Sequence, residues 1–414
     1  MKVPKMTAFT LLLIFLISSS CGCWDLREIN DIGFVIGVGF DKDVNSDKYI
    51  VTAQISKGRS GQQEKDSESI LVLSSEGTTI FEAIRNMAKI SSKRIMWAHN
   101  EVIIIGESLA RDDITGVLDF LTHNMELRMR AWIAVSKGDA KQYLVQKAGM
   151  EGIPAMSINN LFRYSKINGQ ALPTNLIKIY ADYLNSSNQL LIAGLILENN
   201  NHTGDNKNNT GDNTSNKNPE LQTNTNQIQL LGAAVFKGRR MVGWLSPVET
   251  NGVAWMQNQV DDSIVVIPQP QTVSKKMTVE IKETKVDISP VISTGYPSFT
   301  LTVSAKGNIV EEDAPSDMDI EQYKQAAEKA AEALIKENIE LALNKIQQEY
   351  RSDVLGFGNL IKIANFNNWK DIENDWEDIF PVVPVEVSVQ VDILSSTLYH
   401  QPLKSPKKAD AKND

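Results

Sequence analysis

Cysteine is almost absent from this 414-residue chain, and its two cysteines, Cys21 and Cys23, both lie near the N-terminus. The rest of the chain therefore has no internal disulfide, no cysteine-ligated metal and no thiol nucleophile, so its stability must come from packing. Histidine is nearly as scarce, with four residues. Because the sequence contains no HExxH motif and no paired Cys/His spacing, it gives metal binding little support.

Catalytic signatures are missing as well. The sequence has no G-x-S-x-G nucleophile elbow, phosphate-binding loop or dinucleotide glycine fingerprint. His99 is a candidate general base without an evident partner, and we expect a polar residue at a strand entry. Five carboxylates between residues 371 and 378 resemble glycosidase acids, but a solvated helix face is the favoured interpretation. We predict that the protein is not an enzyme and has no cofactor.

Positive charge is in deficit, since 42 Lys and Arg residues against 51 Asp and Glu residues give a net charge of -9. This balance gives no support for nucleic-acid binding, and it disfavours electrostatic attraction of the body to anionic lipid. The hydrophobic fraction of 42% and the charged fraction of 22% are ordinary for a globular protein. A chain of this length has material for two or three domains.

Hydrophobic runs are short, and the most informative one lies at the N-terminus. Lys2 and Lys5 precede an almost unbroken apolar run over residues 9–17. That run is far shorter than the roughly 20 residues that a spanning helix needs. The layout therefore predicts a secretory signal peptide over residues 1–22.

The cysteines behind this run suggest a lipoprotein processing site, at which the thiol is diacylated and becomes the first mature residue. We favour Cys23 because Gly22 precedes it, with Cys21 as the alternative. Ordinary secretion with cleavage near Ser20 is the competing interpretation. Two acyl chains hold a protein stably at a membrane, so we expect the body to fold outside the cytoplasm, tethered by its N-terminus.

An Asn-rich segment divides the chain. Residues 200–227 contain no aromatic residue and only one large aliphatic residue, so they predict a disordered loop or linker. This segment separates an N-terminal region, residues 23–199, from a C-terminal domain, residues 228–400. Residues 401–414 predict a polar tail.

The two regions differ in pattern, and together they predict an α+β fold. The first alternates strand and helix patterns, which favours a mixed α/β region with room for two subdomains. The second opens with a predicted hairpin over residues 229–245 and contains one long helix, about 320–350, and a last strand over 385–394. We expect an antiparallel sheet packed by that helix.

The tryptophans suggest a ligand cleft. Trp244 and Trp369 are candidates to line it. Trp369 and Trp376, spaced by seven, also suit one side of a helix packed on a core, which is the interpretation we favour.

Five sets of segments, spread in order over residues 23–395, resemble one known family. They are CWDLREI at 23–29 with GFVIGVGFD at 33–41, SSKRIMWAHNEVIIIGESLA at 91–110, LLGAAVFKGRRMVGWLSPVET at 230–250, DVLGFGNLI at 353–361, and NNWKDIENDWEDIF at 367–380 followed by VEVSVQV. The family is the C-subunit lipoproteins of spore germinant receptors, the Ger(x)C family of endospore-forming bacteria.

This resemblance implies a non-enzymatic receptor subunit that is lipid-anchored on the outer face of the spore inner membrane. It implies two partners, a multispanning A subunit and an integral-membrane B subunit, in the response to nutrients. The family's lipidated cysteine corresponds to Cys23. The alternative is a solute-binding lipoprotein that itself captures a nutrient. The sequence does not identify the germinant or the surface that meets the partners.

Overall fold

The computed structural model describes most of the chain from residue 31 to residue 396. The described ranges are 9–10, 31–57, 70–123, 127–146, 152–167, 169–185, 187–199, 226–260, 262–270, 272–292, 297–313 and 318–396. Apart from residues 9–10, the predicted leader lies outside them, together with Cys21 and Cys23. The tail at 401–414 also lies outside the described residues, as do residues 200–225 of the Asn-rich segment.

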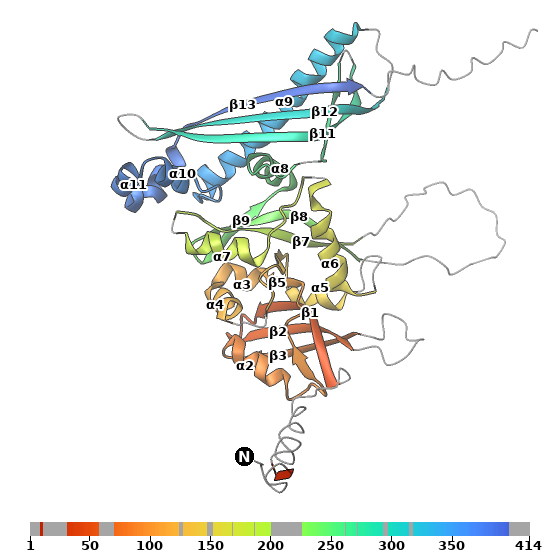
Figure 1. The fold of residues 1–414 in the computed structure, drawn as a ribbon, viewed down its shortest axis with the longest axis vertical. Helices are drawn as coiled ribbons and strands as arrows, with labels where there is room; N and C mark the ends of the chain where they lie inside the picture. The colour runs from red at the N-terminus through yellow and green to blue at the C-terminus, as the bar shows by residue number, and fades with distance from the viewer. Residues whose placement is uncertain are drawn as a thin grey trace, which may run out of the picture.

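The first half of the described chain forms a nine-stranded mixed sheet (Figure 1). Its order is β3-β2-β1-β5-β6-β7-β8-β9, with the short β4 pairing parallel to the start of β1. The strands are β1 (Ile32–Lys42), β2 (Tyr49–Lys57), β3 (Ile70–Gly77), β4 (Arg94–Met96), β5 (Val102–Gly106), β6 (Trp132–Ser136), β7 (Leu191–Asn199), β8 (Asn226–Lys237) and β9 (Arg240–Leu245). The parallel strands β1, β5, β6 and β7 form the centre of the sheet, as expected for a mixed α/β region.

Helices cover both faces of this sheet, and each face has its own buried cluster. One face is covered by α2 (Ile80–Met87), α3 (Glu107–Asp112), α4 (Thr115–His123) and α7 (Leu176–Leu184). The other is covered by α5 (Ala140–Val145) and α6 (Pro154–Arg163). A Cβ on Gly37 of β1 would lie 2.7 Å from the Cβ of Ala155, so glycine allows α6 to pack this closely.

The β8–β9 hairpin belongs to this first sheet. The sequence interpretation assigned the hairpin to the C-terminal region, but β8 pairs antiparallel with β7 along most of its length. Asn199 and Asn226 are direct ladder partners at the two ends of residues 200–225. The Asn-rich segment therefore connects neighbouring strands of one sheet.

The second sheet has four strands in the order β10-β11-β12-β13. They are β10 (Ile264–Gln269), β11 (Thr272–Val291), β12 (Ser298–Glu312) and β13 (Val385–Ser396). The first three pair antiparallel, as expected, but β13 pairs parallel to β12. The helical segments between β12 and β13 provide the crossover that a parallel pair requires.

Two helices connect and cover this sheet: α8 (Pro247–Met256) and the long α9 (Ile320–Asn344) (Figure 1). Ser246 and Glu249 form a capping box at α8, and Asp319 caps α9. A π-helical turn over Lys345–Glu349 ends the long helical segment. The apolar faces of α8 and α9 and the inner face of the sheet form the largest buried cluster, so the predicted sheet-and-helix core is confirmed.

The β13 edge is closed by carboxylates of α9. Glu332 accepts a hydrogen bond from the Val391 amide at 3.0 Å, and Glu328 accepts one from the Ile393 amide at 2.9 Å. Both amides point away from β12 and would otherwise be open to another strand.

Candidate functional site

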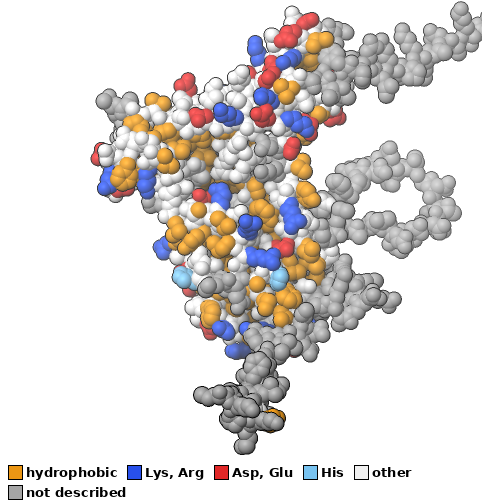
Figure 2. Space-filling model, in the orientation of Figure 1, with side chains coloured by type: hydrophobic (Ala, Val, Ile, Leu, Met, Phe, Trp, Pro, Cys, Tyr) orange, Lys and Arg blue, Asp and Glu red, His pale blue; other side chains and the backbone are white. Residues whose placement is uncertain are grey.

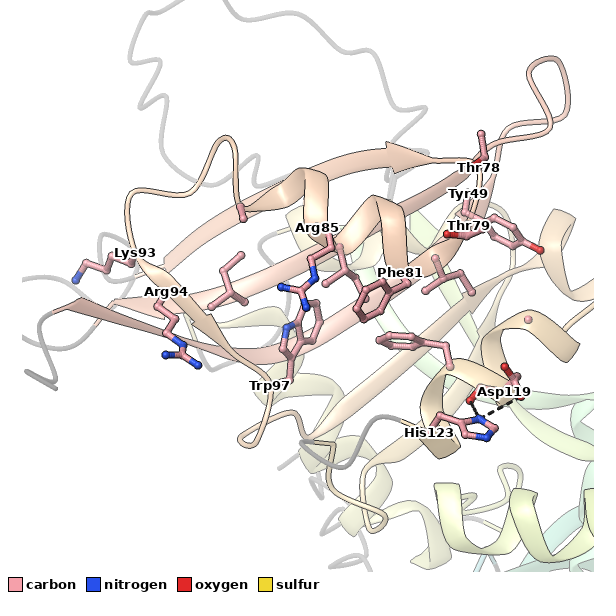
Figure 3. Close-up of a pocket in the computed structure, with 16 residues that line it drawn as sticks. Tyr49, Thr78, Thr79, Phe81, Arg85, Lys93, Arg94, Trp97, Asp119 and His123 are labelled. Atoms are coloured by element: carbon pink, nitrogen blue, oxygen red, sulfur yellow. Dashed lines mark hydrogen bonds and ion pairs between the residues drawn. The ribbon is translucent and has the colours of Figure 1, made fainter. Parts of the chain in front are cut away.

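A groove of about 770 Å³ lies between α2, α4 and the β4 segment (Figure 3). Its apolar lining comes from all three elements and consists mainly of Phe81, Ile84, Ile95, Trp97 and Phe120. The volume falls within the range of small-molecule sites in proteins.

The helix α2 positions one wall of the groove. Thr79 caps the helix by accepting a hydrogen bond from the Glu82 amide at 3.1 Å. The Glu82 carboxylate in turn accepts hydrogen bonds from the Thr78 hydroxyl at 2.6 Å and the Thr78 amide at 2.7 Å, which lower the pKa of that carboxyl. Because α2 carries its own anion at its N-terminus, this end of the helix has little capacity for an external one.

The groove has a basic rim made by Arg85, Lys93 and Arg94. The Arg85 guanidinium lies over the Phe81 ring, 4.9 Å from its centroid. Within the described part of the chain, the side chains of these three cations form no ion pair. Only one acidic side chain, Asp119, lines the groove among the described residues, and it lies 3.1 Å from the imidazole of His123. The rim therefore carries a local excess of positive charge.

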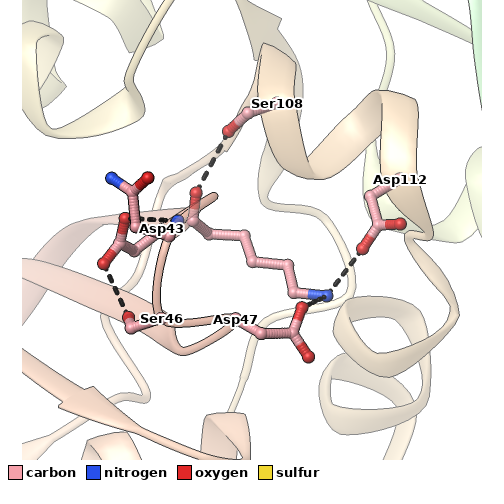
Figure 4. Close-up of polar contacts among 7 residues, drawn as sticks. Asp43, Ser46, Asp47, Ser108 and Asp112 are labelled. Atoms are coloured by element: carbon pink, nitrogen blue, oxygen red, sulfur yellow. Dashed lines mark hydrogen bonds and ion pairs between the residues drawn. The ribbon is translucent and has the colours of Figure 1, made fainter.

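A second hollow, of about 520 Å³, lies beside the turn between β1 and β2. Figure 4 shows polar side chains around this turn, among them Asp47 and Asp112. The Lys42 ammonium lies there 2.6 Å from Asp47 and 2.6 Å from Asp112. The hydrogen bond to Asp112, followed by that to Asp47, raises the pKa of Lys42. The Lys42 ammonium is therefore shared between two carboxylates, and the group of three keeps one negative charge.

Asp41 beside this hollow is buried. Its carboxylate accepts hydrogen bonds from the Ala140 amide at 2.7 Å and the Lys141 amide at 3.1 Å, at the start of α5. Burial raises the pKa of this carboxyl to about 6, partly opposed by those two hydrogen bonds. Asp41 thus joins β1 to α5 and has a structural role.

The residues considered as catalytic candidates are not brought together. His99 is exposed, and its Nδ1 lies 3.1 Å from the Arg128 guanidinium rather than near a carboxylate. The acidic residues predicted to form a solvated face are all exposed: Asp371, Glu373, Asp375, Glu377 and Asp378. Within the described ranges, no group of three or more His, Cys, Asp or Glu side chains is arranged to hold a metal ion.

The tryptophans also have structural positions. Trp369 in α11 (Phe366–Ile372) and Trp376 in α12 (Trp376–Ile379) are buried and contact one another edge to face at 5.6 Å. They lie on two short helices rather than on one. The Trp244 indole donates a hydrogen bond to Glu107 at 3.0 Å. None of the three lines either hollow.

Asp353 organises the segment around these tryptophans. It is 4% exposed and accepts hydrogen bonds from the amides of Phe357 and Gly358, at the start of α10 (Phe357–Ala364), and from the Trp376 indole, at 2.8 to 3.0 Å. Burial raises its pKa to about 6, opposed by these hydrogen bonds. The Asp353 carbonyl also accepts a hydrogen bond from the Gln189 amide, which leads into β7.

Hydrogen bonds join the segment that follows α9 to the first sheet. The Tyr350 hydroxyl donates to the Trp244 carbonyl at 2.8 Å, and the Ser352 hydroxyl donates to the Phe236 carbonyl at 2.5 Å. The chain segment that follows α9 thus holds β8 and β9 of the first sheet.

The comparisons with known proteins account for both halves of the chain. Residues 25–196 match the model described as "Spore germination protein N-terminal domain", and residues 231–397 match "Spore germination B3/ GerAC like, C-terminal". The two-sheet fold and these matched domains are those of a spore germination protein. The chain belongs to the Ger(x)C family, as the sequence resemblance indicated.

The relatives extend over nearly the whole chain. Spore germination protein B3 of Bacillus subtilis (strain 168) is 24% identical over 92% of this chain and 96% of its own length. Spore germination protein KC of the same organism is 24% identical over 94% of this chain and 95% of its own length. The crystal structure of the GerBC protein is 21% identical, has a TM-score of 0.51, and covers 86% of this chain and 97% of its own. The similarity to this crystal structure supports the fold described above.

Helices of the described residues are all too short or too polar to span a membrane.

Proposed function

We propose that this protein is the lipid-anchored, non-enzymatic C subunit of a nutrient germinant receptor. The observation that carries this function is the ordered match of two spore germination domains over residues 25–196 and 231–397. A role without catalysis is supported by His99 and the carboxylates of residues 371–378, which are exposed and separate within the described structure.

The anchor is the diacylated thiol of Cys23, with Cys21 as the alternative. The matched N-terminal domain begins at residue 25, two residues after Cys23. Lipidation there leaves a short tether before β1, which begins at Ile32. The body then lies on the extracytoplasmic face of the membrane, in spores the inner membrane, beside the A and B subunits. The tether raises the local concentration of these partners, so even weak contacts between them are occupied.

The test is replacement of the anchor. We expect Cys23→Ala to release the protein from the membrane fraction of spores and to impair germination, whereas Cys21→Ala retains both properties. Intact membrane retention in Cys23→Ala, with release in Cys21→Ala, would assign lipidation to Cys21. Membrane retention of the double variant Cys21→Ala/Cys23→Ala would show that neither cysteine anchors the protein. Co-purification of the wild-type chain from spore membranes identifies the A and B subunits directly.

The solute-binding alternative is favoured by one observation, the groove of about 770 Å³ between α2 and α4. Trp244 and Trp369, the cleft residues that the sequence suggested, do not line it. Calorimetry of the purified body with amino-acid and sugar germinants tests this alternative. Saturable binding that is lost on replacement of Arg85 would support direct capture of a nutrient.

A further inference from the structure

We infer that the groove between α2 and α4 binds an anionic phospholipid of the membrane to which the chain is tethered. Its basic rim would contact the phosphate, and its apolar lining would contact the upper part of the acyl chains. The orientation of the groove toward the bilayer rests on the proposed anchor at Cys23.

The charge of this surface opposes that of the whole chain. The net charge is -9, yet the segment from residue 80 to residue 94 carries four basic side chains and one acidic side chain. The acidic one, Glu82, is already bound to Thr78 at the N-terminus of α2. Figure 2 shows basic and hydrophobic side chains next to one another at this lower end of the molecule. A local surface of this kind attracts anionic lipid even when the net charge of the protein does not.

Hydrophobic side chains of the same segment are exposed to solvent. Phe81 is 56% exposed, and Ile90, just beyond the end of α2, is 55% exposed. Trp97, which is 5% exposed, also lines the groove (Figure 3). Aromatic rings flanked by Lys and Arg are typical of protein surfaces that lie at the level of lipid headgroups.

The length of the tether keeps this surface near the bilayer. Arg94 is the ladder partner of Ile32, the first residue of β1. Eight residues lie between Cys23 and Ile32, so the chain from one to the other spans about 30 Å at most when fully extended. The start of β1 and the groove lie at the same end of the molecule (Figure 1). A lipid at Cys23 and the rim of the groove therefore reach the same membrane.

The experiment uses the body from residue 24 onward, which lacks both leader and lipid. Every described residue of the three buried clusters lies after Ile32, so the body contains all of them. Co-sedimentation with vesicles measures partition onto phosphatidylcholine alone and onto phosphatidylcholine with about a quarter phosphatidylglycerol. We expect binding to the anionic vesicles that weakens as salt is raised.

The decisive variant is Arg85→Gln/Lys93→Gln/Arg94→Gln. Each basic side chain near an anionic surface contributes about a fivefold gain in partition, so the triple variant should lose on the order of 100-fold at low salt. The matched control, Lys275→Gln/Lys285→Gln/Lys329→Gln, changes the net charge equally on exposed positions of β11 and α9. We expect it to bind nearly as well as the wild type.

A second variant tests the apolar half of the groove. Phe81→Ser keeps every charge and changes an exposed side chain, so it should fold normally and still lose several-fold in partition. Equal losses in the triple variant and its control, or equal binding to neutral and anionic vesicles, would overturn the inference. The inference would also be overturned if the body does not bind vesicles but cross-links through the groove to a subunit of the purified receptor. The groove would then be a protein interface. Failure of the anchor would instead appear in the Cys23→Ala fractionation and leave these vesicle results unchanged.

Discussion

Replacement of Asp353 tests how the C-terminal helices are held, and Asp353→Ala should destabilise the body by about 3 kcal/mol at pH 7.5. The substitution leaves three buried donors without their acceptor: two amides at the start of α10 and the Trp376 indole. Each such donor costs about 1–3 kcal/mol. Part of this loss is offset, because the variant no longer buries a carboxylate that burial disfavours.

The pH dependence distinguishes this account from a simple loss of packing. The pKa of Asp353 is raised in the folded protein from 3.8 to about 6, so the folded state binds this proton more tightly than the unfolded state. Wild-type stability from this group is therefore largest at low pH and is lost as pH rises through 6. Between pH 7.5 and pH 5 the wild type should gain about 1.4 kcal/mol from Asp353, and the variant should not. The cost of the substitution should accordingly be larger at pH 5.

Urea unfolding followed by tryptophan fluorescence measures both effects, since Trp369 and Trp376 are buried beside Asp353. Asp371→Ala, an exposed acid on the neighbouring helix α11, is the control and should change stability by less than about 0.5 kcal/mol at either pH. A cost below about 1 kcal/mol, or one that shrinks at pH 5, would refute the reasoning.

Three further variants test other contacts. The double variant Glu328→Ala/Glu332→Ala should expose the backbone amides at the β13 edge and promote aggregation. Light scattering at increasing protein concentration measures this aggregation. A double variant that stays monomeric at high concentration would show that the two carboxylates are not needed to protect the edge. Tyr350→Phe should cost about 1 kcal/mol of stability through the lost hydrogen bond from the segment after α9 to the Trp244 carbonyl of β9. Urea unfolding measures this cost, and an unchanged midpoint would argue against that bond. Gly37→Val should lower the thermal midpoint strongly, because its Cβ would lie 2.7 Å from that of Ala155; a variant as stable as the wild type would show that α6 can move away.

Strand and helix types followed from local pattern wherever that pattern was periodic. The β8–β9 hairpin, the long helix α9 and the strand β13 were predicted in this way from residues 229–245, about 320–350 and 385–394. The helices α6 and α8 were not predicted. Both begin with proline at the first position, Pro154 and Pro247, which is a helix-start signal that the pattern analysis did not use. The helix α8 is also buried over most of its surface, so it lacks the one-sided pattern that marks a surface helix.

Long-range pairing was the part that the sequence left open. Alternation in β13 gives no direction of pairing, so its parallel alignment with β12 could not be read from residues 385–394. The β8–β9 hairpin was recognised, but its partner, β7, lies before the Asn-rich segment. For the groove, the available signal was the cluster of Arg85, Lys93 and Arg94, which a chain-wide net charge conceals.

The ladder pairing of Asn199 with Asn226 explains why so long a connection between β7 and β8 is compatible with this sheet. Both ends of the segment are fixed as ladder neighbours, so the segment closes a loop. The entropic cost of closing a loop grows only with the logarithm of its length. Doubling it would cost roughly 0.6 kcal/mol. Insertions and deletions between Asn199 and Asn226 should therefore change the free energy of unfolding little, and they require no adjustment in β7 or β8.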